Sequence, residues 1–267
     1  MTSVPMSASR LRLAAVGCAV ALLAACGGGG DGALLAEGAE DTVPAGPRID
    51  VAALDLFPLD AGDLWDYDRI AAGGATSRVT REVVAGPDAN GFFTVRETDA
   101  TLVSDIVYRA GSEGIEQFDP LGARTSMPGA YDALPLVVQY PMPFYAQGGV
   151  RRIVRQGDAR ADLDGDGFSD AYRVEITQVF QGFETQPVFG QPEQVAHFSN
   201  ALAFTIVASS SGGSYTTTTT EEAYLASGLG LVRMDRAAVG SDGAVIVAPY
   251  TLVLQGASIA PLPAASL

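Results

Sequence analysis

The sequence has no lysine, one histidine and two cysteines among its 267 residues. Without lysine the chain cannot form a Schiff base, and with His197 alone it cannot build a zinc site from several imidazoles. The Gly-x-Ser-x-Gly, phosphate-loop and His-Glu-x-x-His motifs are missing as well, which argues against the common hydrolases, nucleotide-binding enzymes and zinc peptidases. These absences together predict that the protein is not an enzyme.

Basic residues are also scarce, because 16 arginines stand against 31 acidic residues and the net charge is −15. An acidic surface repels phosphate backbones, which excludes nucleic acid as a partner. The same charge argues against a basic face that lies on anionic lipid. Attachment to a membrane would therefore need something other than electrostatic attraction.

The first 25 residues have the composition of a secretory signal peptide. Arg10 and Arg12 make the start basic, the following LAAVGCAVALLAAC is apolar but short for a transmembrane helix, and small residues precede Cys26. Residues 23–26, which read LAAC, resemble the lipobox of bacterial lipoproteins. That resemblance implies cleavage before Cys26, a diacylglycerol on its thiol and an acyl chain such as palmitate on the new amino terminus.

A chain processed in this way is anchored in the bacterial cell envelope, because several acyl chains hold a protein stably on a bilayer. Its membrane partner is then reached through the lipid on Cys26. Gly27 occupies the position where many inner-membrane lipoproteins resemble one another in having aspartate, which favours the outer membrane, facing the periplasm. The alternative is an ordinary signal peptide that contains a cysteine.

The remaining chain divides by composition. Residues 26–49 are rich in glycine, alanine, proline and acid, and they predict the lipidated cysteine followed by a flexible linker. Cys18 leaves with the signal peptide and Cys26 carries lipid, so the folded part has no disulfide. We expect one domain over residues 50–258 and a C-terminal tail over residues 259–267.

The domain is predicted to be all-β: a single antiparallel domain built as a curved sheet, half-barrel or sandwich. Apolar and polar residues alternate in short segments separated by turn residues, the pattern of half-buried strands. Segment 119–147, rich in proline and aromatics, is predicted to be an irregular crossing with one helical turn near 131–134. The predicted strands are 64–70, 77–84, 92–97, 101–109, 114–118, 149–156, 171–181, 194–209, 214–225, 230–236 and 244–254.

Two segments near the ends of the domain resemble a family of bacterial β-sheet proteins. Residues 56–67 read LFPLDAGDLWDY and residues 222–233 read EAYLASGLGLVR. Together they are similar to the TapB-like group of secreted and lipid-anchored proteins, which implies an antiparallel β domain and supplies no catalytic residue. We interpret Trp65 and Tyr67 as one face of a strand that closes an end of the core.

The segment DLDGDGFSD resembles the calcium loops of EF-hands, dockerins and thrombospondin-type repeats. Asp162, Asp164 and Asp166 would bind a cation directly, Phe168 through its backbone carbonyl, and Asp170 directly or through water. A hard cation that collects several oxygens offsets the repulsion between these carboxylates.

The resemblance stops at the twelfth position, where an EF-hand has a bidentate glutamate and this chain has Arg173. The predicted Ca²⁺ site is therefore structural and weak, with a dissociation constant on the order of 10⁻⁴–10⁻³ M. The alternative is a solvated acidic turn, since aspartate and glycine favour turns without any metal.

These observations predict a lipid-anchored cell-envelope protein with a non-catalytic binding or structural role, whose partner is another envelope protein or a hydrophobic ligand. One alternative is a carrier of lipid or another hydrophobic ligand, of the half-barrel type. A second alternative is an envelope hydrolase, because carboxylate pairs are plentiful in so acidic a chain. That alternative would need His197 exposed in a cleft beside carboxylates, whereas its apolar neighbours favour a hydrogen-bonded core or edge histidine.

Overall fold

The structure is a computed structural model that describes residues 37–50 and 56–259. The predicted signal peptide, the lipidation site Cys26 and residues 260–267 of the predicted tail lie outside the described residues. Within the described part, no helix is long and apolar enough to cross a membrane.

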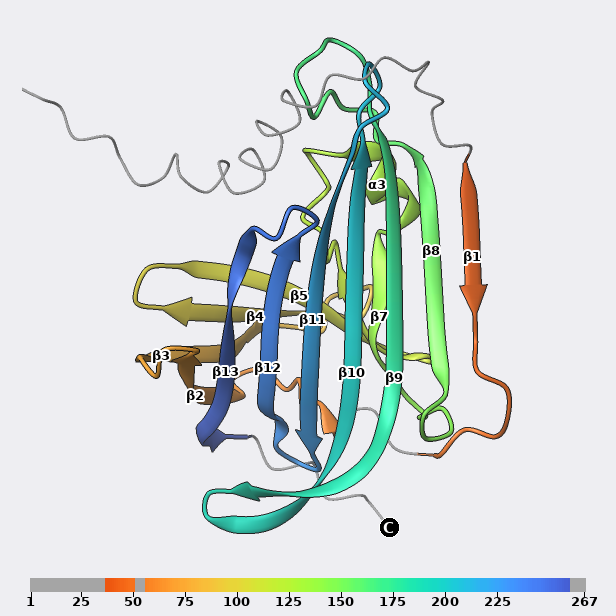
Figure 1. Cartoon of the computed structure of the whole chain (residues 1–267). Helices are drawn as coiled ribbons and strands as arrows, with labels where there is room; N and C mark the ends of the chain where they lie inside the picture. The colour runs from red at the N-terminus through yellow and green to blue at the C-terminus, as the bar shows by residue number, and fades with distance from the viewer. Residues whose placement is uncertain (1–36, 51–55, 260–267) are drawn as a thin grey trace, which may run out of the picture.

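Thirteen strands of the described chain form one antiparallel sheet (Figure 1). Its order is β1-β8-β9-β10-β11-β12-β13-β2-β3-β4-β5-β6-β7, so β1 and β7 are its two edges and the sheet does not close into a barrel. The predicted all-β antiparallel fold is therefore confirmed. The strands are β1 Gly38–Thr42, β2 Leu64–Ala71, β3 Thr76–Ala85, β4 Phe92–Asp99, β5 Val103–Gly111, β6 Gly114–Phe118, β7 Leu136–Pro141, β8 Val150–Asp158, β9 Ala171–Val188, β10 Gln191–Val207, β11 Ser214–Ala226, β12 Gly230–Gly240 and β13 Val245–Ser258.

Eleven of these strands lie where alternation predicts them. In β2, for example, Trp65 and Tyr67 are buried while Leu64 and Asp66 are only half-buried. The largest difference is the hairpin of β9 and β10, whose paired residues continue to Val188 and Gln191. Glycine, proline and polar residues make up most of this extension, so its apolar alternation is too weak to reveal the strands.

Two strands lie where the sequence predicts none. β1 falls inside the segment expected to be a linker, and its side chains are all exposed. Its five residues add to the edge of β8 through backbone pairing, which needs no apolar pattern. β7 falls inside the expected irregular crossing and ends at Pro141, which is tolerated because β7 is an edge strand. The expected helical turn is present as α3, Pro128–Ala133.

The sheet folds over on itself, so that one of its halves covers the other. The long-strand half consists of β8–β13 with β1, and the short-strand half, β2–β7, lies behind it; β3, β4 and β5 run across the long strands (Figure 1). The main apolar core fills the space between the halves. It joins Tyr67 and Ile115 of the short-strand half to Phe198, Leu225 and Leu252 of the long-strand half.

The two segments that resemble the TapB-like group meet at one end of this core. The indole nitrogen of Trp65 donates to the carbonyl of Leu229 at 2.7 Å, and the Tyr67 hydroxyl donates to the carbonyl of Leu231 at 2.8 Å. The turn between β11 and β12 needs Gly230 at φ +80°, where an added Cβ would lie 3.2 Å from Pro58. The structure thus assigns both segments a packing role.

A second apolar cluster lies beside α3, on the inner face of β8 and β9. It joins Met127, Ala130 and Val137 to Ile153 and Ile176. The helix contacts β8, so it covers one side of the long-strand half. The inner face of β10–β12 lies between the two clusters, and neither of them fills it completely.

Asp99 holds the turn between β4 and β5. Its carboxylate accepts the backbone N–H groups of Thr101 and Leu102, each at 2.7 Å, and a bond from Arg69 at 3.0 Å. These contacts, the Thr101 backbone N–H first, lower the pKa of Asp99 to about 2. The ionised form is therefore favoured in the folded state.

We expect Asp99→Ala to lower the free energy of unfolding by roughly 1–2 kcal/mol at pH 7. The pKa of Asp99 is lower in the folded state than its ordinary value of about 3.9. The stabilisation by Asp99 is therefore complete above about pH 4 and is lost as pH falls toward about 2. Urea unfolding of both proteins from pH 7 down to pH 3 should show the difference shrinking. A difference that does not depend on pH would contradict this account.

Candidate functional site

A row of polar side chains crosses the inner face of the long-strand half. Arg151, Gln178, Asn200, Glu221 and Arg236 come from β8, β9, β10, β11 and β12. Each is the direct register partner of the next, so the five form one line across five strands. We call this line the polar row. The polar row is not among the features predicted from the sequence. The signal for it is a polar residue in each strand at an inward-facing position, where alternation predicts an apolar side chain.

The polar row is largely buried, so its polar groups need partners. Arg151, Gln178 and Glu221 are only 7%, 2% and 7% exposed. Facing them across the interior is β7, whose Gln139 and Tyr140 donate to Oε1 of Glu221 at 3.1 Å and 3.3 Å. Burial and the neighbouring Glu221 raise the pKa of Tyr140, which keeps its hydroxyl protonated as the donor.

Other groups of the polar row remain without a partner among the described residues. The amide oxygens of Gln178 and Asn200 are buried and accept no hydrogen bond. The three bonds that Glu221 accepts, from Gln139, Tyr140 and Asn200, all reach its Oε1 and leave Oε2 free. The Arg236 guanidinium makes no hydrogen bond or ion pair within this part of the chain, and its side chain is exposed.

The rows beside the polar row are apolar or made of threonine. Leu202 of β10 pairs with Thr219 of β11, and Phe204 pairs with Thr217. All four side chains are only half-buried, although they belong to the middle strands of the sheet. Side chains on central strands are normally fully buried when another layer covers them. The short-strand half therefore does not pack closely against these four side chains.

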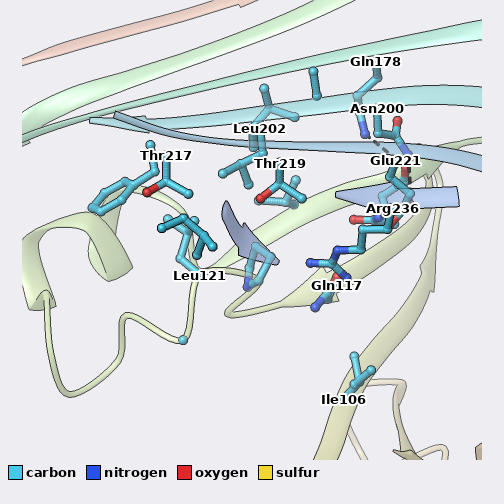
Figure 2. A pocket seen from close by; sticks show the side chains of 18 of the residues that line it. Ile106, Gln117, Leu121, Gln178, Asn200, Leu202, Thr217, Thr219, Glu221 and Arg236 are labelled. Carbon is cyan, nitrogen blue, oxygen red and sulfur yellow. Dashed lines mark hydrogen bonds between the residues drawn. The ribbon is translucent and has the colours of Figure 1, made fainter. Parts of the chain in front are cut away.

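The space left between the halves is a cavity of about 330 Å³. Figure 2 shows Gln178, Asn200, Glu221 and Arg236 gathered at one end of it and Leu121 and Thr217 toward the other. The cavity is therefore amphipathic, with a polar end and an apolar end. Its apolar lining includes Ile106, Leu121, Met127, Val137, Ile176, Leu202, Phe204, Ile206, Met234 and Ile246.

One further charged side chain lines the cavity from the short-strand half. Arg81 of β3 donates to Glu97 of β4 at 2.8 Å and forms an ion pair with it. The two side chains are 13% and 16% exposed. The pair is nearly buried, and Glu97 also accepts a bond from Arg69, which pairs with Asp99, so the two arginines and two carboxylates form a neutral group in the wall.

His197 belongs to neither the polar row nor the cavity lining. Its ring stacks on Tyr224 at 4.4 Å, and its Nε2 lies 2.8 Å from the carboxylate of Glu222. The Ser199 hydroxyl donates to the same carboxylate. The serine is thus bonded to Glu222 and not to the imidazole, so the group lacks the nucleophile–base contact of a hydrolase.

The acidic loop brings three of its predicted ligands together. One carboxylate oxygen of each of Asp162, Asp164 and Asp166 lies within 4.8 Å of the others. The fourth aspartate, Asp170, is fully buried and accepts the backbone N–H groups of Leu163, Asp164 and Ser209 at 2.7, 3.2 and 3.0 Å. Asp170 therefore holds the backbone of the loop.

Backbone amides partly offset the like charges of this loop. Asp162 accepts the N–H groups of Gly165 and Gly167 at 2.6 and 2.9 Å, and Asp166 accepts that of Phe168 at 2.8 Å. The Phe168 side chain itself is 67% exposed. Even so, burial raises the pKa of Asp164, and the neighbouring carboxylates raise it further. A divalent cation would relieve this repulsion, so the calcium site stays a prediction, and three of its five predicted ligands lie close together.

The comparisons with known proteins return a fold likeness and no family. No protein-family model and no curated protein matches the chain. The TapB-like resemblance and the lipobox therefore stay predictions.

Three solved structures are similar to this chain over 76% of its length. A protein from Bacteroides fragilis, described as exported and with a YmcC-like fold, shares 12% identity at a TM-score of 0.43, over 98% of that chain. A protein from Parabacteroides distasonis, described as a lipoprotein, shares 14% at a TM-score of 0.38, over 97%. The hypothetical lipoprotein YmcC from Escherichia coli shares 10% at a TM-score of 0.32, over 85%.

We expect millimolar calcium to raise the melting temperature of the protein by a few degrees. Asp164→Ala should abolish the rise, because it removes one ligand and part of the repulsion that the cation offsets. A thermal melt in EDTA and in millimolar calcium measures both effects.

The matched control is Asp88→Ala, which removes another turn aspartate that accepts backbone N–H groups, those of Asn90 and Phe92. This variant should lose some stability and keep the calcium response. If the unchanged protein melts at the same temperature in both buffers, the loop is a solvated turn.

Proposed function

We propose that the protein is a lipid-anchored envelope protein that binds an amphipathic ligand in the cavity between the two halves of its sheet. The observation that carries the proposal is the cavity of about 330 Å³ with a polar and an apolar end. Ligand sites are concave and mostly apolar with a few placed polar groups, and they start at roughly 300 Å³. The role is binding and not catalysis, in the manner of the half-barrel carrier among the sequence-based alternatives.

The packing around the cavity supports this proposal. An accidental gap in a core is normally small and lined by apolar atoms, since interiors are close-packed. This cavity instead is lined by the half-buried Leu202 and Phe204 and also by the guanidinium of Arg236, which makes no hydrogen bond or ion pair within the described chain. A ligand that covers these side chains would bind the folded state only, and it would therefore stabilise the folded protein.

The position in the envelope rests on the sequence before the sheet. The lipobox resemblance at Cys26 and the glycine-rich segment after it support a tether that holds the sheet near a bilayer. Gly27 favours the outer membrane. A carrier placed there would meet lipids and other amphipathic molecules at short range.

A bulky side chain on the cavity face should block binding. We expect Thr219→Trp to weaken the binding of the neutral fluorescent probe N-phenyl-1-naphthylamine by at least about ten-fold, because the indole occupies the space beside Leu202. Fluorescence titration of the full-length chain with Cys26→Ser, which removes the predicted covalent lipid, measures the affinity.

The control is Thr218→Trp, one residue away on the same strand. Thr218 is half-buried like Thr219, but it pairs with Val239, which is exposed, whereas Thr219 pairs with Ala238, which is buried. The control should bind the probe as the unchanged protein does. Equal binding by both tryptophan variants would show that the probe does not use the cavity, and the proposed function would fail.

The anchor makes a separate prediction. Cells that express the protein should incorporate labelled palmitate into it, and Cys26→Ser should abolish the label and release the protein from the membrane fraction, since the thiol is the predicted attachment point. Absence of the label from the unchanged protein would favour the ordinary signal peptide, and membrane association that survives in Cys26→Ser would indicate another mode of attachment.

A further inference from the structure

We infer that the ligand of the cavity carries an uncharged head that both donates and accepts hydrogen bonds, as a hydroxyl or an amide does, on an apolar chain. This inference rests on the proposed function of the cavity as a binding site. It follows from two properties of the polar end: its charges balance, and its unpaired groups are of both kinds.

Three charged side chains line the cavity, Arg81, Glu221 and Arg236, and Glu97 behind the wall offsets the charge of Arg81. Arg81 is neutralised by Glu97 at 2.7 Å. Glu221 and Arg236 are register partners on β11 and β12, and they contribute one negative and one positive charge. A charged head placed between these two partners would be attracted by one of them and repelled by the other, so its own charge would stay uncompensated in a partly buried space, which is costly.

The unpaired groups at the polar end include both acceptors and a donor. Oε2 of Glu221 can accept a hydrogen bond and has no donor within the described chain, and the unpaired amide oxygens of Gln178 and Asn200 lie buried behind it. Arg236 can only donate, and it has no acceptor there. A hydroxyl donates one hydrogen bond and accepts others, so a single small head can satisfy Glu221 and Arg236 together.

The location of these groups decides the shape of the ligand. They all belong to the polar row and lie at one end of the cavity, with Leu121 and Thr217 toward the opposite end (Figure 2). A molecule with its head on Glu221 and Arg236 therefore lays its chain along Leu202 and Thr219. Burial of the chain supplies affinity, and the head fixes the orientation.

The test compares probes that share a dodecyl-type chain and differ in the head. The probes are 1-monododecanoylglycerol, methyl dodecanoate, dodecanoate and dodecylammonium, each below its micelle concentration. Calorimetric titration uses the full-length chain with Cys26→Ser at about 150 mM salt, which screens the general attraction of an acidic protein for cations.

We expect 1-monododecanoylglycerol to bind about ten-fold more tightly than methyl dodecanoate, which can accept hydrogen bonds but cannot donate them. Both charged probes should bind more weakly than 1-monododecanoylglycerol.

Two substitutions then unbalance the charge in opposite directions. Glu221→Gln leaves the positive charge of Arg236 and should shift the preference toward dodecanoate by about ten-fold. Arg236→Gln leaves the negative charge of Glu221 and should shift it toward dodecylammonium. A merely structural role for either residue would not reverse the preferred sign of the head.

The controls are Glu222→Gln and Arg233→Gln, which make the same changes on the same two strands. Neither residue lines the cavity, and Arg233 forms an ion pair with Asp235 at 2.9 Å. Both controls should keep the preference of the unchanged protein. Methyl dodecanoate binding should also survive in Glu221→Gln and Arg236→Gln, which shows that the cavity is intact.

Two results overturn the inference while the proposed function stands: methyl dodecanoate binding as tightly as 1-monododecanoylglycerol, or a charged probe binding most tightly to the unchanged protein. If none of the four probes binds, the cavity is not an amphiphile site, and the proposed function fails together with the inference.

Discussion

The pairing of β13 with β2 is the interaction on which the rest of the structure depends. It joins the last strand to the second one and so makes a single hydrogen-bonded sheet out of two halves that would otherwise be separate. The register shifts between Leu254 and Gly256 in this pairing, and such irregularities bend a sheet. Because the joined sheet folds over, the inner face of each half is covered by the other, and Trp65 and Tyr67 reach the segment between Leu229 and Leu231.

The same pairing explains why the polar row can exist. A carboxylate such as that of Glu221 can be buried only where donors meet it, and these come from two directions. Asn200 reaches it from the neighbouring strand, while Gln139 and Tyr140 reach it from β7, at the far end of the sheet order. A slip of one residue in any of these strands would turn its member of the polar row to the outer face. The register of the long strands therefore decides whether the polar end of the cavity forms.

Charges are offset in different ways in the acidic loop and at the polar end of the cavity. In the loop, backbone amides next to Asp162 and Asp166 offset the carboxylates locally, and Asp170 ties the loop to Ser209. At the polar end of the cavity, Glu221 and Arg236 come from neighbouring strands. Their opposite charges offset each other, although the two side chains form no ion pair. A cation suits the first arrangement, and a small polar head suits the second.

Local pattern alone determined much of this protein. Alternation predicts eleven strands and the antiparallel all-β class, DLDGDGFSD predicts a turn whose carboxylates gather, and Trp65 with Tyr67 is correctly expected to close one end of the core. These features depend on residues close together in the chain. Only the tertiary structure decided that β1 adds to β8, that β7 is a strand, and that Gln178, Asn200, Glu221 and Arg236 lie in one line. Such features depend on the register of strands that are distant in sequence, and the period of a single strand carries no information on its partner.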